Sequence, residues 1–217
     1  MAKILRGAAA IHLKLLACKV LQRELSYLSA KCQNNIDITY IRQGFHNEPA
    51  KLRGILQGEI DAIDAGTDVH SGNDRPFDAI LIGYGLCSNG VAGLSSKKFP
   101  LVIPKAHDCT TLLLGSREKY DRFFKQNSGG IYWYSPGWIE NAPMPGRERY
   151  EAQYREYVEK YGEDNADYLM EMEQGWMTEY SRLIYIDWDA LSFPRHIAFA
   201  RECAEYLNWH MDVVKGD

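Results

Sequence analysis

The chain has 217 residues, a length typical of one folded domain, and no linker-like stretch separates two independent halves. With 46% hydrophobic and 25% charged residues, it has enough apolar surface for a core and lacks the composition of a disordered protein. The net charge of -4 and the pI near 5.9 argue against a nucleic-acid-binding surface, which needs an excess of Lys and Arg. We therefore expect a single domain over residues 1–217 that binds neither DNA nor RNA.

The apolar runs and the cysteine count bear on where the protein works. The longest apolar runs are far shorter than the roughly 20 residues that a membrane-spanning helix needs. Residues 1–10 carry two basic residues but only a short apolar stretch, which Lys14 soon interrupts, so a secretory signal is not expected. Five cysteines, an odd number without paired spacing, are typical of reduced thiols rather than of a disulfide framework. These features predict a cytoplasmic protein that does not associate with membranes.

Strand and helix patterns alternate along the first part of the chain. The run at residues 77–84 is almost continuously apolar, which is typical of a strand buried on both faces, and we interpret it as the central strand. The other predicted strands cover residues 11–17, 36–42 and 100–105. The predicted helices cover residues 18–32, 50–65 and 109–126.

The second part continues the pattern after an interruption. A strand is predicted at 130–134, and three prolines with two glycines predict an irregular loop at 135–146. Residues 147–180 are rich in Glu and Tyr with helical patterning, so we expect two helices, separated by Gly162, that form an insertion or cap. A last unit follows, with strand 183–187, helix 194–207 and strand 211–214. The alternation predicts an α/β fold with a mainly parallel, doubly wound (Rossmann-like) sheet and helices on both faces.

Cysteine and histidine gather where this fold places its ligand sites. In doubly wound sheets, ligands bind outside the carboxyl ends of the strands. Three of the five cysteines and two of the six histidines follow predicted strands directly, together with one aspartate. In chain order, these residues are Cys18, His46, Cys87, His107, Asp108 and Cys109. We expect their loops to open on the same edge of the sheet.

The residue types at this edge predict a metal site. Thiolate and imidazole are the ligands that zinc and related transition metals prefer, and a catalytic zinc keeps three protein ligands and one open position. Cys87, His107 and Cys109 could supply that set, with Cys18 as a further metal ligand. In an extended loop His107 and Cys109 lie on the same side, while Asp108 points away or orients an imidazole. Three cysteines equally suit an iron–sulfur cluster with one open iron, so zinc, iron and a cluster all remain candidates.

Further residues are candidates for catalysis or for contact with a bound group. Asp108 and His46 are the candidate catalytic residues, although His46 could equally be a turn-stabilising imidazole. The glycine-rich loop around Cys87 lacks the spacing of a nucleotide-binding motif, so we interpret its glycines as permitting sharp turns. The expected contacts to a small molecule are Ser88, Asn89, Gly90 and Trp138, the last of which could instead be a core residue.

A structural interpretation competes with function for each cysteine. Cys is among the most buried residue types, and Cys18 could simply pack beneath its helix. Cys87 and Cys109 stand beside polar or glycine-rich loop residues, which favours a functional role. Cys32 and Cys203 lie inside predicted helices, so we expect both to be structural.

Several stretches carry a family resemblance: LLACKVLQREL, QGFHNEP, GYGLCSNG, PLVIPKAHDCTTLLLGSREKY and YWYSPGW. Over about residues 15–138 they resemble an uncharacterised bacterial and archaeal family, catalogued as domain of unknown function sixteen thirty-eight. Members resemble accessory proteins encoded near corrinoid-dependent methyltransferases that act on methylated amines. The resemblance implies a role in one-carbon metabolism, with a small-molecule substrate or a corrinoid protein as partner. The family's motif residues correspond here to Cys18, His46, Asn47, Cys87, Asn89, Gly90, His107, Asp108, Cys109, Ser135, Pro136, Gly137 and Trp138.

Together, the residues and the resemblance predict a metal-binding enzyme or accessory factor in corrinoid-linked methyl transfer. Its ion, zinc or iron, would activate a thiol, a water or a methyl acceptor. Two alternatives stay open. One is a metal-free enzyme in which Cys87 and Cys109 act as an acid–base pair, as in two-thiol racemases. The other is a non-catalytic module that carries a corrinoid or a metal.

Overall fold

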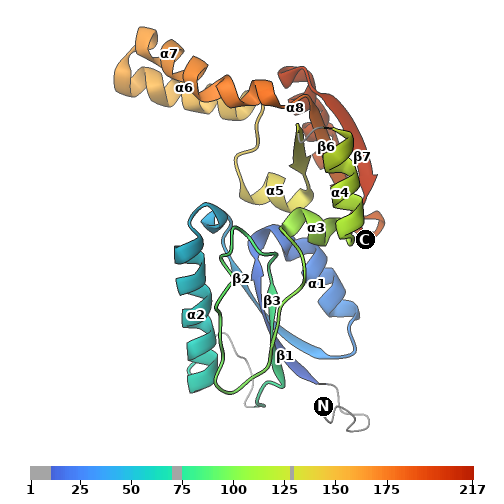
Figure 1. Cartoon of the computed structure of the whole chain (residues 1–217). Coiled ribbons are helices and arrows are strands. Elements are labelled where there is room, and N and C mark those ends of the chain that lie inside the picture. Colours follow the sequence, from blue (N-terminus) through green and yellow to red (C-terminus); the bar gives the residue numbers. More distant parts are fainter. Residues whose placement is uncertain (1–10, 70–74, 128–129) are drawn as a thin grey trace. The chain divides into compact units, whose positions relative to one another are not determined.

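Every strand in the described part of the chain pairs in parallel, and the strands form two sheets. The computed structural model describes residues 11–69, 75–127 and 130–217, so the expected absence of a signal in residues 1–10 lies outside the described residues. The chain divides into an N-terminal unit, Met1–Cys109, and a C-terminal unit, Thr110–Asp217 (Figure 1). The predicted α/β class with parallel strands is confirmed, with the strands divided between two sheets. That the chain acts as a single domain stays a prediction.

The N-terminal unit contains a four-stranded sheet in the order β2-β1-β3-β4. Its strands are β1 (His12–Cys18), β2 (Asn35–Ile41), β3 (Ala79–Gly83) and β4 (Leu101–Val102). A short 3-10 turn, η1 (Lys19–Leu21), leads from β1 into α1 (Gln22–Lys31), and η2 (Phe45–Asn47) leads from β2 into α2 (Pro49–Ala65). The crossover from β1 to β2 runs across the sheet in one direction, and the crossover from β2 to β3 runs back past β1 in the opposite direction. Right-handed connections therefore place α1 and α2 on opposite faces of the sheet, as Figure 1 shows.

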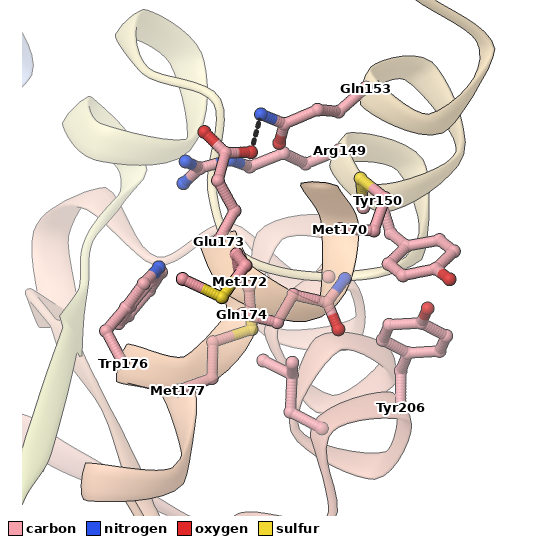
Figure 2. A pocket seen from close by; sticks show the side chains of 12 residues that line it. Arg149, Tyr150, Gln153, Met170, Met172, Glu173, Gln174, Trp176, Met177 and Tyr206 are labelled. Atoms are coloured by element: carbon pink, nitrogen blue, oxygen red, sulfur yellow. Dashed lines mark hydrogen bonds between the residues drawn. The ribbon is translucent and has the colours of Figure 1, made fainter. Parts of the chain in front are cut away.

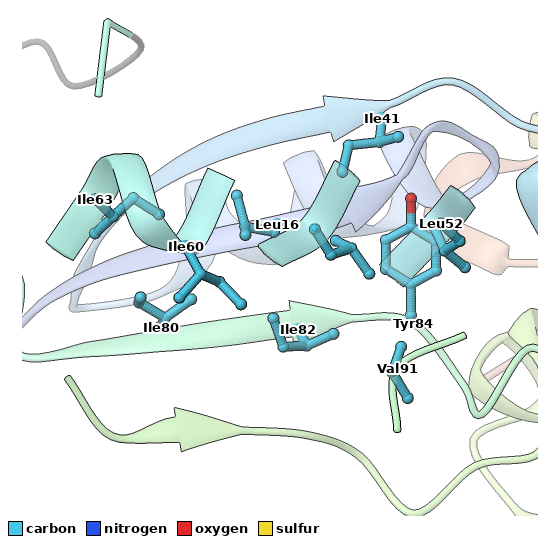
Figure 3. Packing of buried hydrophobic residues seen from close by; sticks show 10 residues of the cluster. Leu16, Ile41, Leu52, Ile60, Ile63, Ile80, Ile82, Tyr84 and Val91 are labelled. Carbon is cyan, nitrogen blue, oxygen red and sulfur yellow. The ribbon is translucent and has the colours of Figure 1, made fainter. Parts of the chain in front are cut away.

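One face of α2 forms the core of this unit. Leu52, Leu56, Ile60 and Ile63 recur at helical spacing and are buried. They pack against the sheet in one cluster with Leu16, Ile80 and Ile82 (Figure 3). Full burial of one such side chain stabilises the fold by about 1.5–3 kcal/mol. This cluster anchors the carboxyl ends of β1 and β3, where the candidate site lies.

Two predictions about residues 100–126 need correction. The single helix expected over 109–126 is wrong: α3 (Cys109–Leu114) ends before Gly115, which has a φ of +67°. A new helix, α4 (Arg117–Gln126), starts because the Ser116 hydroxyl accepts a hydrogen bond from the Lys119 N–H at 3.2 Å. The strand expected over 100–105 is only two residues long, because Pro100 and Pro104 have no N–H to donate to the ladder.

The C-terminal unit contains a three-stranded sheet in the order β5-β6-β7. The strands are β5 (Ile131–Tyr134), β6 (Arg182–Asp187) and β7 (His210–Lys215), with η4 (Asp189–Leu191) and α8 (Pro194–Leu207) between the last two. The irregular loop expected over 135–146 is partly wrong, because it begins with the short helix α5 (Pro136–Asn141). Ser135 caps this helix by accepting from the Trp138 N–H at 3.3 Å, and Pro136 occupies its first turn.

Two helices fill residues 147–174, as the sequence predicts. They are α6 (Arg147–Tyr161) and α7 (Glu163–Gln174), followed by the 3-10 turn η3 (Gly175–Glu179). Gly162 separates them with a φ of +81°, a conformation that favours glycine. Figure 1 shows the pair as a long antiparallel hairpin. Among the described helices, none is both long and apolar enough to cross a bilayer.

Candidate functional site: three cysteines around Tyr84

Three cysteines lie at the carboxyl edge of the N-terminal sheet. Cys18 is the last residue of β1, Cys87 follows β3 by four residues, and Cys109 is the first residue of α3. We call Cys18, Cys87 and Cys109 the thiol cluster. All three are partly buried, and Cys18 and Cys87 both pack against the core cluster that includes Tyr84.

Backbone contacts bring the loops of this edge together. Ala17 and Gly83 are partners in the parallel ladder, so Cys18 and Tyr84 follow at equivalent heights. A Cβ on Gly85 would lie 2.5 Å from the backbone nitrogen of Asp108, so only glycine permits this close approach. The N–H groups of Leu86 and Cys87 donate to the carbonyls of Ala106 and His107 at 2.8 and 3.1 Å. These bonds continue the pairing of the β3 and β4 segments beyond the strands themselves.

The loop that carries Cys87 has an unusual backbone. Cys87, Ser88 and Asn89 have φ values of 44°, 55° and 65°, which puts three consecutive non-glycine residues in the left-handed region. Each such residue costs about 1–2 kcal/mol relative to ordinary conformations, and this kind of strain gathers at functional sites. The Arg53 guanidinium holds the loop by donating to the Asn89 carbonyl at 2.9 Å. The surrounding structure therefore maintains a conformation that the residues do not favour by themselves.

Tyr84 joins the thiol cluster although sequence reasoning treated it only as the end of a strand. The residue is 4% exposed, and its hydroxyl has no hydrogen-bond partner among the described residues. Burial raises its pKa, and the charges of all three cysteines raise it further. The sequence signal that could have identified Tyr84 is a hydroxyl directly after an apolar strand, at the edge where ligands bind.

The thiols also act on one another. Burial, then the charges of Cys18 and Asp108, raise the pKa of Cys87 to about 11. Burial, then the charges of Cys18, Cys87 and Asp108, raise the pKa of Cys109 well above its usual value. Burial also raises the pKa of Cys18, although a hydrogen bond from the Val20 backbone N–H lowers it in part. Cys18 thus acts on both other thiols and Cys87 acts on Cys109, in agreement with the packing of Cys18 and Cys87 against the core cluster and with the contact of Gly85 with Asp108.

The structure places the other predicted site residues as follows. Asp108 is partly buried, and its charge acts on both Cys87 and Cys109, whereas the His107 residue is exposed and its carbonyl is bonded to the loop. His46 is exposed in η2, after β2. Within residues 11–69, 75–127 and 130–217, no three side chains of His, Cys, Asp or Glu are arranged to hold a metal ion. The roles assigned to these residues stay predictions.

The predicted small-molecule contacts differ in their surroundings. Ser88 and Asn89 are exposed, whereas Gly90 is buried, and a Cβ there would lie 2.7 Å from the Leu52 side chain. Trp138 belongs to the C-terminal unit, where it packs against the core cluster that contains Tyr134 and Leu183. Ser88 and Asn89 therefore stand at the surface beside the thiol cluster, and Trp138 has the packing of a core residue.

The two remaining cysteines lie outside the thiol cluster. Cys32 is exposed directly after α1. Cys203 is buried within α8, in the core cluster of the C-terminal unit. Their effect on metal content stays a prediction.

The fold and the site define an α/β protein with a partly buried thiol cluster at the carboxyl edge of a parallel sheet. The sequence matches the family described as "Protein of unknown function (DUF1638)" over residues 40–217, and the chain belongs to that family. The match contains Cys87, Asp108 and Cys109, whereas Cys18 precedes it. No curated protein and no solved structure matches the chain.

Proposed function

We propose that this protein binds a thiophilic transition metal, as an ion or as an iron–sulfur cluster, mainly through Cys87 and Cys109, with His107 and Cys18 as further ligands. The observation that supports the proposal is the gathering of three thiols around the buried Tyr84 hydroxyl, which has no partner in the described part of the chain. A buried polar group without a partner costs about 1–3 kcal/mol, so a ligand that meets it stabilises the folded protein.

The charge environment favours metal binding over the metal-free alternative. A cysteine nucleophile or base needs a lowered pKa, which basic neighbours or helix N-termini provide. Here the pKa of Cys87 is raised to about 11, and no basic side chain is among the groups that act on it. Cys109 begins α3, but burial and the charges of Cys18, Cys87 and Asp108 still raise its pKa. At neutral pH the thiols are therefore protonated and weakly reactive. A bound cation reverses this balance, because it stabilises thiolates and displaces their protons.

Metal binding requires movement in this site, because no three described ligands already have the geometry to hold an ion. The loop of Cys87, Ser88 and Asn89 is the segment we expect to adjust, since its left-handed backbone stores strain that another conformation releases. Asp108 lies beside two of the thiols, where it would orient a ligand or a substrate, and His107 is the candidate for a fourth ligand.

The experiment is elemental analysis and visible absorption of protein purified under reducing, oxygen-free conditions. We expect about one zinc per chain without colour, or iron with sulfide and visible absorption. Cys87→Ser and Cys109→Ser should each remove most of the metal and leave the fold intact. Replacing Cys18 or His46 should have a smaller effect. Cys32→Ser and Cys203→Ser are the matched controls and should retain the metal.

Two results would contradict the proposal. One is wild-type protein without stoichiometric metal, which would favour the metal-free, two-thiol acid–base function over metal binding. The other is an equal loss of metal in the control variants. The pH dependence provides a further check: protons compete for the thiolates, so binding should weaken steadily as the pH falls toward ~6.5, where imidazole also gains a proton.

The family resemblance adds a role for the metal, as an enzyme or accessory factor in corrinoid-linked methyl transfer. A thiolate-bound ion can activate a thiol, a water or a methyl acceptor. Mixing the metal-loaded protein with methylcobalamin and a thiol acceptor tests this role. We expect the corrinoid spectrum to change faster with wild-type protein than with Cys87→Ser. Equal rates would leave a metal-binding module without this activity.

A further inference from the structure

The C-terminal unit contains a cavity of about 330 Å³ that the thiol cluster does not touch. It lies where α6, α7 and η3 meet α8 (Figure 2). Its size is at the lower end of the range for small-molecule sites. The lining residues are Gly146, Arg149, Tyr150, Gln153, Met170, Met172, Glu173, Gln174, Trp176, Met177, Tyr206 and Leu207.

The cavity wall combines polar groups with apolar, adaptable side chains. Three methionines contribute thioether side chains, which fill irregular space and make favourable contacts with aromatic rings. Tyr150 and Tyr206 pack edge to face with ring centroids 6.1 Å apart, and Trp176 adds a third ring to the wall. Such a wall suits an aliphatic, thioether or aromatic side chain.

The cavity wall contains one cationic and one anionic side chain. The Arg149 guanidinium is partly buried and donates to the Pro143 carbonyl at 3.4 Å, and no carboxylate of the described residues forms an ion pair with it. The Glu173 carboxylate accepts a hydrogen bond from the Gln153 side-chain amide, which joins α6 to α7 (Figure 2). Glu173 likewise forms no ion pair with a described cation. The cavity therefore offers one cationic and one anionic group, each with bonding capacity left.

We propose that this cavity binds a free α-amino acid with an apolar side chain. A guanidinium binds a carboxylate through two parallel hydrogen bonds, so Arg149 takes the carboxylate of the ligand. The ammonium group meets Glu173 and the faces of the aromatic rings, which attract cations. The apolar side chain lies among the methionines. A ligand with both charges can pair with Arg149 and with Glu173 at once, whereas a ligand with only one charge gains one of these two interactions.

Calorimetric titration of the full-length protein tests the proposal with L-methionine, L-leucine and L-phenylalanine as probes. We expect at least one of them to bind with a Kd below about 1 mM. The matched analogues 3-phenylpropanoate and 2-phenylethylamine each lack one charge of phenylalanine and should bind at least about tenfold more weakly. Arg149→Gln and Glu173→Gln should each weaken binding of the amino acid by at least about tenfold. Arg201→Gln, on the exposed surface of α8, is the control and should bind as wild type does.

Three results would overturn the proposal. The first is the absence of saturable binding of all three amino acids up to about 10 mM. The second is binding of the single-charge analogues as tightly as of phenylalanine, which would identify a merely apolar cavity. The third is unchanged affinity in Arg149→Gln and Glu173→Gln variants that melt at the wild-type temperature. If either variant unfolds, the analogue series decides the question on wild-type protein. These results are independent of metal content, so the two proposals fail separately.

Discussion

Each unit has parallel strands and its own buried apolar cluster, but the cysteines of the two units have different surroundings. In the N-terminal unit, Cys87 shares its neighbourhood with two other thiols and with a Tyr84 hydroxyl that has no partner among the described residues. In the C-terminal unit, Cys203 is the single cysteine of a core where the Tyr134 hydroxyl donates to the Pro145 carbonyl at 2.5 Å. Burial raises the pKa of both Cys87 and Cys203 to about 11. A raised pKa by itself therefore reports burial, whereas several such groups beside an unsatisfied hydroxyl indicate a site.

The largest expected effect tests whether the two cores belong to one cooperative domain. Leu56 and Leu183 are fully buried in the cores of the N-terminal and C-terminal units. Replacing either by Ala should lower the free energy of unfolding by about 2–5 kcal/mol, because each substitution removes apolar contacts and leaves a cavity. The single-domain prediction expects both variants to shift one shared calorimetric transition. Two transitions, each shifted by only one variant, would show instead that the units unfold separately.

Glycine substitutions beside the thiol cluster and beside Cys203 should have smaller effects on stability than the core substitutions. A Cβ on Gly85 would lie 2.5 Å from the Asp108 nitrogen, and one on Gly146, with a φ of +155°, would lie 2.6 Å from the Cys203 sulfur. We expect Gly85→Ala and Gly146→Ala each to lower the free energy of unfolding by about 1–3 kcal/mol in denaturant titrations. Only Gly85→Ala should also reduce metal content.

The control for these substitutions is Gly58→Ala, in the middle of α2, where an added Cβ has no heavy atom within 4 Å. Alanine is the better helix former, so this variant should be more stable than wild type by about 0.5–1 kcal/mol. Metal loss in Gly146→Ala equal to that in Gly85→Ala would contradict the separation between the thiol cluster and the Cys203 core.

A further comparison is the response of the metal-free protein to alkaline pH. A thiol whose pKa is raised by folding stabilises the folded state below its unfolded pKa, about 8.5, and this contribution disappears as the pH rises through the folded pKa. For Cys87 and Cys203 the folded value is about 11, so stability should decline between these pH values. Unfolding titrations at pH 8 and pH 10.5 should show a smaller decline in Cys87→Ser and in Cys203→Ser than in wild type. With metal bound, the contribution of Cys87 should vanish while that of Cys203 persists.

Local patterns predicted most of the elements, including the first strand, expected over residues 11–17 and observed as His12–Cys18, and the pair of helices on either side of Gly162. Two of the errors lie where a single cap decides the structure. Gly115 and Ser116 divide one expected helix, and Ser135 with Pro136 starts a helix inside an expected loop. These signals occupy one or two residues, so the surrounding composition outweighed them in the prediction.

The sequence by itself determined the α/β class and the positions of Cys18, Cys87 and Cys109 after predicted strands, because hydrophobic periodicity and chain order are local properties. Only the tertiary structure decided what surrounds those thiols. The contact of Gly85 with Asp108, the left-handed turn at Cys87 and the buried Tyr84 hydroxyl depend on segments more than twenty residues apart or on backbone angles that composition does not encode. The same holds for the cavity lined by Arg149 and Glu173. These two residues lie on separate helices, and they line one cavity only because α7 folds back along α6. Which residues become neighbours in this way depends on the apolar burial of the whole unit, and no single segment of the sequence determines it.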